Sequence, residues 1–486
     1  MSEFVLAIDQ GTTGTTAVLV GRSGVIAAHN VEFPNYFPAP GLVEHDAEEI
    51  WASVATVVGK VLEGVDPRQI AAIGITNQRE TSLFWDGSGR PLHRALVWQD
   101  RRTAERCEQL RAAGWEDRVR ARTGLVLDPY FSGTKAEWML QNVPGLREKA
   151  ENGSAHYGTI DSFLVYRLCG QHVTDPSNAS RTLLYDIHRQ SWDPELCALL
   201  GVPMACLPRV VDNAGIIGHT RGVGFLPDGI PVAGIAGDQQ SALFGQACFK
   251  PGMAKCTYGT GAFVLLNTGD AAVASRHGLL TTIAWRLNGR VEYALEGSAF
   301  VAGAAVQWLR DGLGFFSSSA EVEELAATVP DAGGVIFVPA LAGLGAPHWR
   351  PDARGLLCGL TRGSTKAHIA RAVLEGMALQ VVDMLRAMEA DAGRPLAELR
   401  VDGGAARNNL LMQYQADVLE VRCVRPKNLE STAMGAAYLA GIGVGFWSSP
   451  EAVSDAWARD RGFEPSRPKA EVDQIMKHWS DAVRRA

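Results

Sequence analysis

The sequence predicts an α/β protein built from two domains of similar plan. A chain of 486 residues is too long for one ordinary core. Apolar β-type runs alternate with helical segments. Each half also opens with a strand, a turn rich in glycine and threonine, and a second strand. These hairpins are expected over residues 4–20 and 255–267. We place the boundary near residues 247–252, giving domains of residues 1–248 and 249–486.

Composition excludes several classes of protein. Hydrophobic residues make up 47% and charged residues 20%, which is typical of a globular chain and not of a disordered one. The net charge of −7 argues against nucleic acid or an anionic membrane as a partner. No secretion signal and no run of about 18 apolar residues is visible. The 8 cysteines form no C-x-x-C pair, which disfavours zinc and redox motifs. A cytoplasmic location is expected.

Polar clusters follow two predicted strands. Strands are expected over residues 70–76 and 232–236, and the polar runs 77–80 and 237–240 come directly after them. Open α/β sheets bind ligands at such strand ends. Later strands are expected over 335–339 and 399–401, and a helix over 367–388. The tail after Trp447 is expected to be a surface helical extension.

The turn after the first strand carries phosphate-binding chemistry. Asp9 stands at the strand end, and residues 11–16 contain two glycines and four threonines. Such a loop can hold ATP phosphates with the carboxylate near Mg²⁺, or it can be a simple threonine-rich turn. It is not a Walker A loop. Residues 258–263 repeat the same chemistry in the second half. Two such hairpins predict a nucleotide held between domains, as in the actin and hexokinase superfamily.

Two further segments allow a functional and a structural interpretation. The double glycine Gly403–Gly404 leads from a strand into a helix. It can admit a base or ribose against the backbone, or it can simply pack the helix on the sheet. Asp238 begins an apolar helical stretch. It can take the proton of a phosphate acceptor, or it can cap the helix, and the segment alone favours the cap.

Taken together, these segments resemble the FGGY carbohydrate kinases from residue 4 to about residue 463. The opening loop matches at residues 9–13, and the two family signatures match at 130–138 and at 355–375. Four other stretches are similar to the members that phosphorylate glycerol, namely residues 74–81, 97–99, 128–135 and 236–240.

The resemblance implies a fold and an activity. The fold would be two actin-like (ribonuclease H-like) α/β domains with an ATP cleft between them. The activity would be ATP- and Mg²⁺-dependent phosphorylation of glycerol to sn-glycerol 3-phosphate, the first step of glycerol catabolism. The partners would be glycerol, ATP and further copies of the chain in a dimer or tetramer, without nucleic acid or an integral membrane contact. A kinase for another small polyol or ketose, and a non-catalytic ATP-binding module, remain as alternatives.

The same resemblance implies roles for individual residues. Asp238 would be the general base. The glycerol site would comprise Arg79, Glu80, Trp98, Tyr130, Asp238, Gln239 and Phe263. The nucleotide site would comprise Thr12, Thr13, Gly14, Thr260, Gly303, Gln307, Gly404 and Asn408, and Asp9 would lie on the Mg²⁺ side.

Three departures from the family pattern stand out. Thr16 occupies a position where the family usually has an arginine that reaches the phosphates. Residues 222–229 lack the glycine–arginine loop that binds fructose bisphosphate in some members, and they lack the histidine that is phosphorylated in others. Residues 348–352 read His-Trp-Arg-Pro-Asp where Tyr-Trp-Asp-Pro-Tyr is usual. Nothing in the sequence explains the last change.

Overall fold

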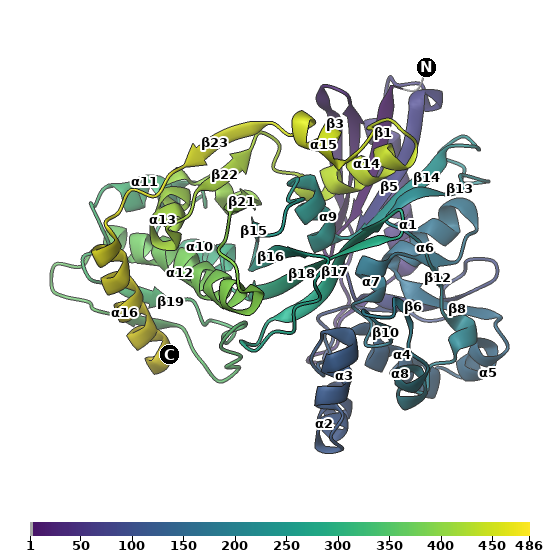
Figure 1. Ribbon diagram of the computed structural model, residues 1–486, viewed down its shortest axis with the longest axis horizontal. Helices are drawn as coiled ribbons and strands as arrows, with labels where there is room; N and C mark the ends of the chain where they lie inside the picture. The colour runs from purple at the N-terminus through teal and green to yellow at the C-terminus, as the bar shows by residue number, and fades with distance from the viewer. Residues whose placement is uncertain (1–2) are drawn as a thin grey trace.

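The computed structural model describes residues 3–486 and places two large sheets side by side in two lobes (Figure 1). The first sheet has the strand order β13-β14-β5-β1-β2-β3. Its strands are β1 (Phe4–Gln10), β2 (Gly14–Gly21), β3 (Gly24–Glu32), β5 (Ile70–Asn77), β13 (Ala214–His219) and β14 (Pro231–Gly237).

The second sheet has the order β17-β18-β16-β15-β21-β22-β23. Its strands are β15 (Met253–Tyr258), β16 (Ala262–Gly269), β17 (Leu280–Leu287), β18 (Arg290–Ala299), β21 (Glu398–Asp402), β22 (Cys423–Pro426) and β23 (Arg459–Phe463).

The two sheets share one topology. In the first, β2 is antiparallel to both of its neighbours, β3 and β1, while β5 and β14 continue parallel to β1, and β13 is antiparallel at the edge. The second repeats this pattern with β18, β16, β15, β21, β22 and β23 in the same places. Two copies of one open α/β plan are the predicted actin-like architecture, with β17 as an addition at one edge.

Smaller sheets and helices complete the first half. A four-stranded sheet and two strand pairs contain β4 (Glu44–His45), β6 (Ser82–Asp86), β7 (Ala95–Leu96), β8 (Ala155–Thr159), β9 (Val173–Thr174), β10 (Tyr185–Asp186), β11 (Ser191–Trp192) and β12 (Arg209–Val210). The helices are α1 (Ala47–Val61), α2 (Ala104–Ala112), α3 (Glu116–Thr123), α4 (Ser132–Asn142), α5 (Leu146–Glu151), α6 (Ile160–Cys169), α7 (Pro176–Ala179), α8 (Pro194–Leu199) and α9 (Asp238–Gly245).

The second half adds one strand pair and its own helices. The pair is β19 (Ile336–Val338) with β20 (Leu356–Cys358). The helices are α10 (Gly303–Gln307), α11 (Glu321–Ala327), α12 (Lys366–Ala392), α13 (Asn409–Leu419), α14 (Ser431–Gly443), α15 (Pro450–Ala456) and α16 (Lys469–Arg485).

Strand β1 shows how the sheet builds two cores. Its alternate side chains point to opposite faces. Leu6 and Ile8 join a buried cluster with residues of α1 such as Val54, while Val5 and Ala7 join one that contains residues of α14. The unbroken apolar run of β1 therefore follows from helices that cover both faces.

Helix α14 belongs to the second half of the chain but packs on the first sheet, where Figure 1 shows it over β1 and β5. It also crosses α9 at very close range. A Cβ on Gly245 would lie 1.9 Å from the carbonyl oxygen of Ser431, and one on Gly435 would lie 1.8 Å from that of Ser241. Only glycine permits this approach. The predicted division at residue 248 stays a prediction.

The expectation for the tail was partly wrong. Residues 459–463 form β23, which pairs with β22 at the edge of the second sheet. Helix α16 is not a purely surface helix, because Trp479 is buried in the core of the second half. Apolar residues spaced for one face of α16 (Val472, Trp479 and Val483) could have indicated this burial.

Candidate active site

The two predicted polar clusters meet at one edge of the first sheet. Strands β5 and β14 are parallel neighbours, with Asn77 opposite Gly237. Their carboxyl ends therefore come together. Arg79 follows β5 and Asp238 follows β14, and Arg79 Nε lies 3.0 Å from Asp238 Oδ1.

Arg79 also joins a buried network of charges. Its Nη1 and Nη2 donate to the two carboxylate oxygens of Glu296, at 2.5 and 2.9 Å. Arg181 Nη2 donates to Glu296 at 3.0 Å, and Arg181 Nε donates to Glu80 at 2.7 Å. All four side chains are at most 2% exposed. Two cations and two anions balance, as buried charges require.

Glu80 is held in an unusual backbone conformation. Its φ is +63°, which is uncommon for a residue with a Cβ. Arg181 holds its carboxylate, and Ser132 Oγ donates to its carbonyl oxygen at 2.9 Å. Such conformations cost about 1–3 kcal/mol and concentrate at functional sites. The conformation places Glu80 beside Arg79, with 3.9 Å between Arg79 Nε and Glu80 Oε1.

Aromatic side chains border this polar group. Arg79 Nη2 donates to the Tyr130 hydroxyl at 3.5 Å. The rings of Tyr130 and Trp98 meet edge-to-face, with centroids 5.6 Å apart. Trp98 Nε1 donates to Thr12 Oγ1 at 2.9 Å, which links the aromatic wall to the turn after β1. Phe263 lies half-buried on β16, and no hydrogen bond or ring pair of its side chain joins it to these residues within the described chain.

Asp238 is the first residue of α9, and the N-cap position belongs to Gly237. The structure thus departs from the capping interpretation of Asp238. Its Oδ1 accepts the neighbouring Gln239 N–H at 2.7 Å and forms the ion pair with Arg79 described above. Burial raises the pKa of Asp238, while the nearby cations Arg79 and Lys255 oppose that rise. A carboxylate in this setting has a proton affinity above that of a surface aspartate and suits general-base chemistry.

A second group of predicted residues lines a cavity of about 450 Å³ in the second half. The group is Thr260, Gly303, Gln307, Gly404 and Asn408. Thr260 comes from the β15–β16 hairpin, and its carbonyl oxygen accepts the N–H groups of Ala302 and Ala304 at 2.8 and 3.1 Å. The hairpin and the start of α10 therefore form one wall. The cavity is of a size that small ligands occupy.

Two features of this cavity indicate a ligand. A Cβ added to Gly404 would meet no atom within 4 Å, so the glycine leaves open space at the wall. Asn408 caps α13 by accepting the Leu411 N–H at 2.9 Å, while its Nδ2 is buried without a partner among the described residues. A buried donor without an acceptor is costly, and a ligand could supply the acceptor.

Thr12, Thr13 and Gly14 form the corresponding turn of the first half and are not among the described residues that line this cavity. Gly14 has a packing reason to be glycine, because a Cβ there would lie 2.8 Å from the Val31 carbonyl oxygen. Thr13 is exposed. Thr12 accepts from Trp98, as described above.

Asp9 lies at the end of β1 near other carboxylates. Burial raises its pKa to about 8, and the charges of Asp238 and Glu430 add to the rise. Loss of the Asp9 proton is therefore unfavourable unless a cation binds nearby. Among residues 3–486, no set of three or more His, Cys, Asp or Glu side chains forms a ready metal cage.

Comparison with known proteins identifies the family. Residues 4–245 match the N-terminal domain of the FGGY family of carbohydrate kinases, and residues 254–444 match its C-terminal domain. The chain belongs to the FGGY family of carbohydrate kinases. It is 57% identical to the glycerol kinase of Myxococcus xanthus (strain DK1622), covering 100% of this chain and 99% of that protein. It is 58% identical to the glycerol kinase of Dechloromonas aromatica (strain RCB), over 100% and 97% of the two chains.

Solved structures agree with this FGGY assignment. The glycerol kinase of Plasmodium falciparum with ADP superposes with a TM-score of 0.93 at 37% identity, covering 99% of this chain and 98% of that one. The xylulose kinase of Lactobacillus acidophilus, at 21% identity, 99% and 96% coverage and a TM-score of 0.89, shares the fold. The two-domain α/β fold is thus that of FGGY kinases.

Sequence reasoning missed three charged residues around this FGGY site. Glu296 and Arg181 hold Arg79 and Glu80, and Lys255 lies beside Gln239. Lys255 is the one charged residue of β15, and Glu296 lies within the buried run 293–297 of β18. A charge inside an apolar strand is a signal that could have indicated them.

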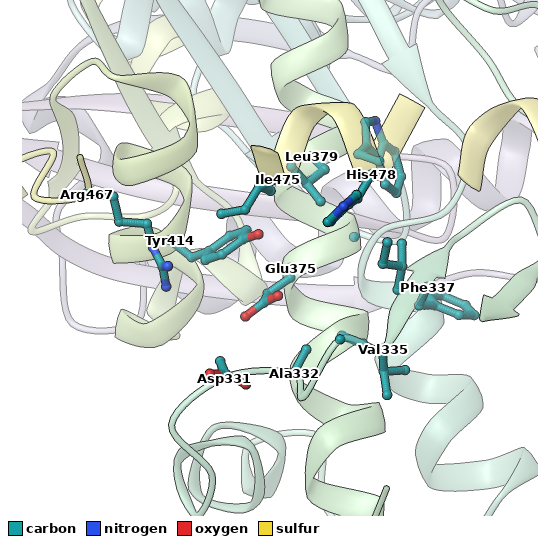
Figure 2. Close-up of a pocket in the computed structure, with 15 residues that line it drawn as sticks. Asp331, Ala332, Val335, Phe337, Glu375, Leu379, Tyr414, Arg467, Ile475 and His478 are labelled. Carbon is teal, nitrogen blue, oxygen red and sulfur yellow. The ribbon is translucent and has the colours of Figure 1, made fainter. Parts of the chain in front are cut away.

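A further cavity of about 180 Å³ lies between α12, α13 and α16 (Figure 2). Figure 2 shows Tyr414, Glu375 and His478 around it. None of the predicted site residues lines it, in so far as the chain is described. Glu375 is paired with Arg371 at 2.9 Å, and Arg467 lies near Asp417 and Glu471. These ion pairs involve Glu375 and Arg467, two of the charged residues at its wall.

Proposed function

We propose that this chain transfers the γ-phosphate of ATP to glycerol, giving sn-glycerol 3-phosphate. The observation that carries the proposal is the grouping of Asp238, Arg79, Glu80, Tyr130 and Trp98 at one sheet edge. A triol has hydroxyl groups along one side and C–H groups along the other. Charged partners and aromatic walls complement these two sides. The full-length relatives named above are themselves glycerol kinases.

In the proposed reaction, Asp238 accepts the proton of a terminal hydroxyl while that oxygen attacks the γ-phosphorus in line. Arg79 lies 3.0 Å from the Asp238 carboxylate and favours its charged form. Arg79, Glu80, Tyr130 and Gln239 bind the hydroxyls, and Trp98 with Phe263 covers the carbon chain. The base and ribose occupy the 450 Å³ cavity beside Gly404 and Asn408. Exclusion of water protects the phosphate from hydrolysis.

The residues present suit Mg²⁺. Burial and neighbouring carboxylates raise the pKa of Asp9 to about 8. A bound cation would therefore be stabilised by the negative charges there. The described chain provides no complete cage, which fits an ion that keeps several waters and binds substrate phosphates. When bound, Mg²⁺ would neutralise phosphate charge. We propose that Asp9 lies on its side of the site, and that Thr12, Thr13, Gly14 and Thr260 contact the phosphates.

Turnover on a panel of acceptors tests the proposal. The purified chain is assayed with ATP and Mg²⁺ against glycerol, xylitol, xylulose and dihydroxyacetone, with ADP release as the signal. We expect the highest kcat/KM with glycerol; phosphorus NMR should show a terminal glycerol monophosphate, and oxidation by a stereospecific sn-glycerol-3-phosphate dehydrogenase should identify it as sn-glycerol 3-phosphate. Preference for a ketose would favour another FGGY substrate. Nucleotide binding without any turnover would favour a non-catalytic ATP-binding module.

Location and assembly stay predictions. Among residues 3–486, no helix combines the length and apolarity needed to cross a membrane. All 8 cysteines lie in the described part of the chain and are free there. Free thiols are compatible with the reducing cytoplasm. A homodimer or homotetramer was expected from the family resemblance, and sedimentation of the purified chain would test it.

A further inference from the structure

Lys255 is a buried charge in the second sheet that the proposed reaction does not yet use. It lies on β15, five residues before Thr260, and is fully buried. Its side chain presents no exposed surface to a ligand. Burial lowers the pKa of Lys255, while Asp402, Cys256 and Asp238 favour its charged form. Burying an ammonium group costs free energy unless hydrogen bonds or opposite charges compensate it. The partners of Lys255 therefore show what its burial achieves.

The ammonium group of Lys255 connects the phosphate hairpin to the proposed glycerol site. Its Nζ donates to the side-chain oxygen of Gln239 and, at 2.9 Å, to Thr257 Oγ1. Gln239 follows Asp238 directly at the start of α9. Lys255 belongs to the second half of the chain and Gln239 to the end of the first, so this contact crosses between them.

The contact fixes which end of the Gln239 amide faces outward. An ammonium group is only a donor, so the amide end that contacts it must be the carbonyl oxygen. The opposite end is then the NH₂ group. Gln239 Nε2 donates to no other described residue, and the residue keeps 9% of its surface exposed. The NH₂ group is therefore free to donate to a ligand.

We infer that Lys255 is a positioning residue that holds the Gln239 amide with its NH₂ group toward the acceptor substrate. The inference rests on the proposed function. An attacking hydroxyl must give its proton to Asp238, so its oxygen can only accept a further hydrogen bond from the protein. A fixed donor at Gln239 and a fixed acceptor at Asp238 together complement one hydroxyl in one orientation.

The test is a double-mutant cycle between Lys255→Met and Gln239→Ala. Methionine keeps the volume and removes the donor and the charge. We expect Lys255→Met to raise the glycerol KM about tenfold or more while the ATP KM stays within about threefold. In the Gln239→Ala background, Lys255→Met should change the glycerol KM less than threefold. An unchanged glycerol KM in the single variant, or equal effects in both backgrounds, would overturn the inference.

Two further variants keep the test decisive. Thr257→Val removes the other acceptor of Lys255 without touching Gln239, and it should leave the glycerol KM within about threefold. If Lys255→Met does not fold, Gln239→Glu serves instead, because a carboxylate keeps the Lys255 contact but lacks the NH₂ donor. It should raise the glycerol KM at least tenfold, and an unchanged value would overturn the inference. Failure of the unmodified chain to phosphorylate glycerol would instead contradict the proposed function.

Discussion

At the scale of single residues, Asp238 tests the chemistry most directly. Asp238→Asn keeps the shape of the side chain and removes the proton acceptor. We expect turnover to fall at least a thousandfold, within the usual range for a lost general base, while glycerol binding stays within about tenfold. ADP release gives the rate, and calorimetric titration with glycerol gives the affinity. A variant that keeps more than about a tenth of the rate would mean that Asp238 has a structural role.

Whereas the Asp238 variant removes a functional group, a substitution at Thr16 is expected to add a contact with the nucleotide. It lies directly opposite Asp9 on the antiparallel pair β1–β2, so the two side chains share a face. Thr16→Arg should therefore bring a cation beside the carboxyl whose pKa is raised to about 8. One charge-assisted hydrogen bond, partly exposed, should lower the ATP Kd by up to about tenfold.

The control for that experiment is Thr16→Met, which adds length without charge. Both variants lose the hydrogen bond from Asn30 Nδ2 to Thr16 Oγ1, at 2.9 Å. Only the arginine variant should bind ATP more tightly. Weaker ATP binding by Thr16→Arg than by Thr16→Met would show that this loop has adapted around threonine.

Sequence alone could place some of these residues and not others. Arg79 and Asp238 each follow an apolar strand, and their strands proved to be parallel neighbours. The apolar pattern of the two strands, and the tendency of ligand-binding residues to follow strand ends, were enough to predict that Arg79 and Asp238 belong to one site. Glu296 lies more than 200 positions from Arg79 along the chain, and their ion pair depends on how the two halves pack. No local pattern contains that information.

At the scale of elements, residues 221–229 form a loop that carries a prediction about regulation. The Asp228 carboxylate accepts the Gly222 N–H at 2.7 Å, so a backbone donor that could bind phosphate is already occupied. Phe225 packs against Trp51, with ring centroids 5.3 Å apart, and Pro227 has no N–H. An aspartate here also repels anions. The loop thus lacks the features that phosphate binding requires.

We expect fructose bisphosphate at millimolar concentration to leave the rate unchanged at saturating glycerol and ATP. The assay is ADP release with and without the effector. Sodium sulfate at matched ionic strength controls for screening of charges. Arg221 is the cation beside this loop, so Arg221→Ala distinguishes weak local binding from binding elsewhere. Cooperative inhibition of the unmodified chain would mean that an effector site exists outside this loop.

Most elements near the site followed from local patterns. The predicted hairpins became β1–β2 and β15–β16, the strands over 70–76 and 232–236 became β5 and β14, and the helix over 367–388 became α12. Strong periodicity and glycine turns define such elements locally. The tail was harder, because β23 gains its stability from pairing with β22, a contact that the residues 459–463 do not encode by themselves.

At the scale of the whole molecule, the two halves of the chain pack against each other and are not merely connected by a linker. Helix α14 covers the first sheet, with α15 beside it, although most of the second half forms the other lobe. Close approach at Gly245 and Gly435 fixes how α9 and α14 cross. The sequence shows these glycines, but the partner of each lies about 190 positions away. The sequence predicted two domains of similar topology. It did not predict that a helix of the second half packs on the sheet of the first.

The ion pair between Arg79 and Glu296 is the charged part of this junction, and it carries the last prediction. Although burial opposes ionisation of Glu296, Arg181 and Arg79 lower its pKa to about 2. Glu296→Gln would leave two buried guanidinium groups with one fewer carboxylate. Removing one partner of a buried pair costs roughly 3–5 kcal/mol. We therefore expect a lower melting temperature and, because Arg79 keeps at most one of its two hydrogen bonds to residue 296, a glycerol KM raised about tenfold or more.

Restoring the charge balance separates these two effects. The double variant Glu296→Gln with Arg181→Gln removes one anion and one cation, so part of the lost thermal stability should return. The glycerol KM should stay high in the double variant, because Arg79 still lacks the carboxylate that holds both of its terminal nitrogens. Melting curves and initial rates on the unmodified chain and the two variants measure both quantities. Recovery of the glycerol KM together with stability would show that Glu296 serves folding alone and does not orient Arg79 for the substrate.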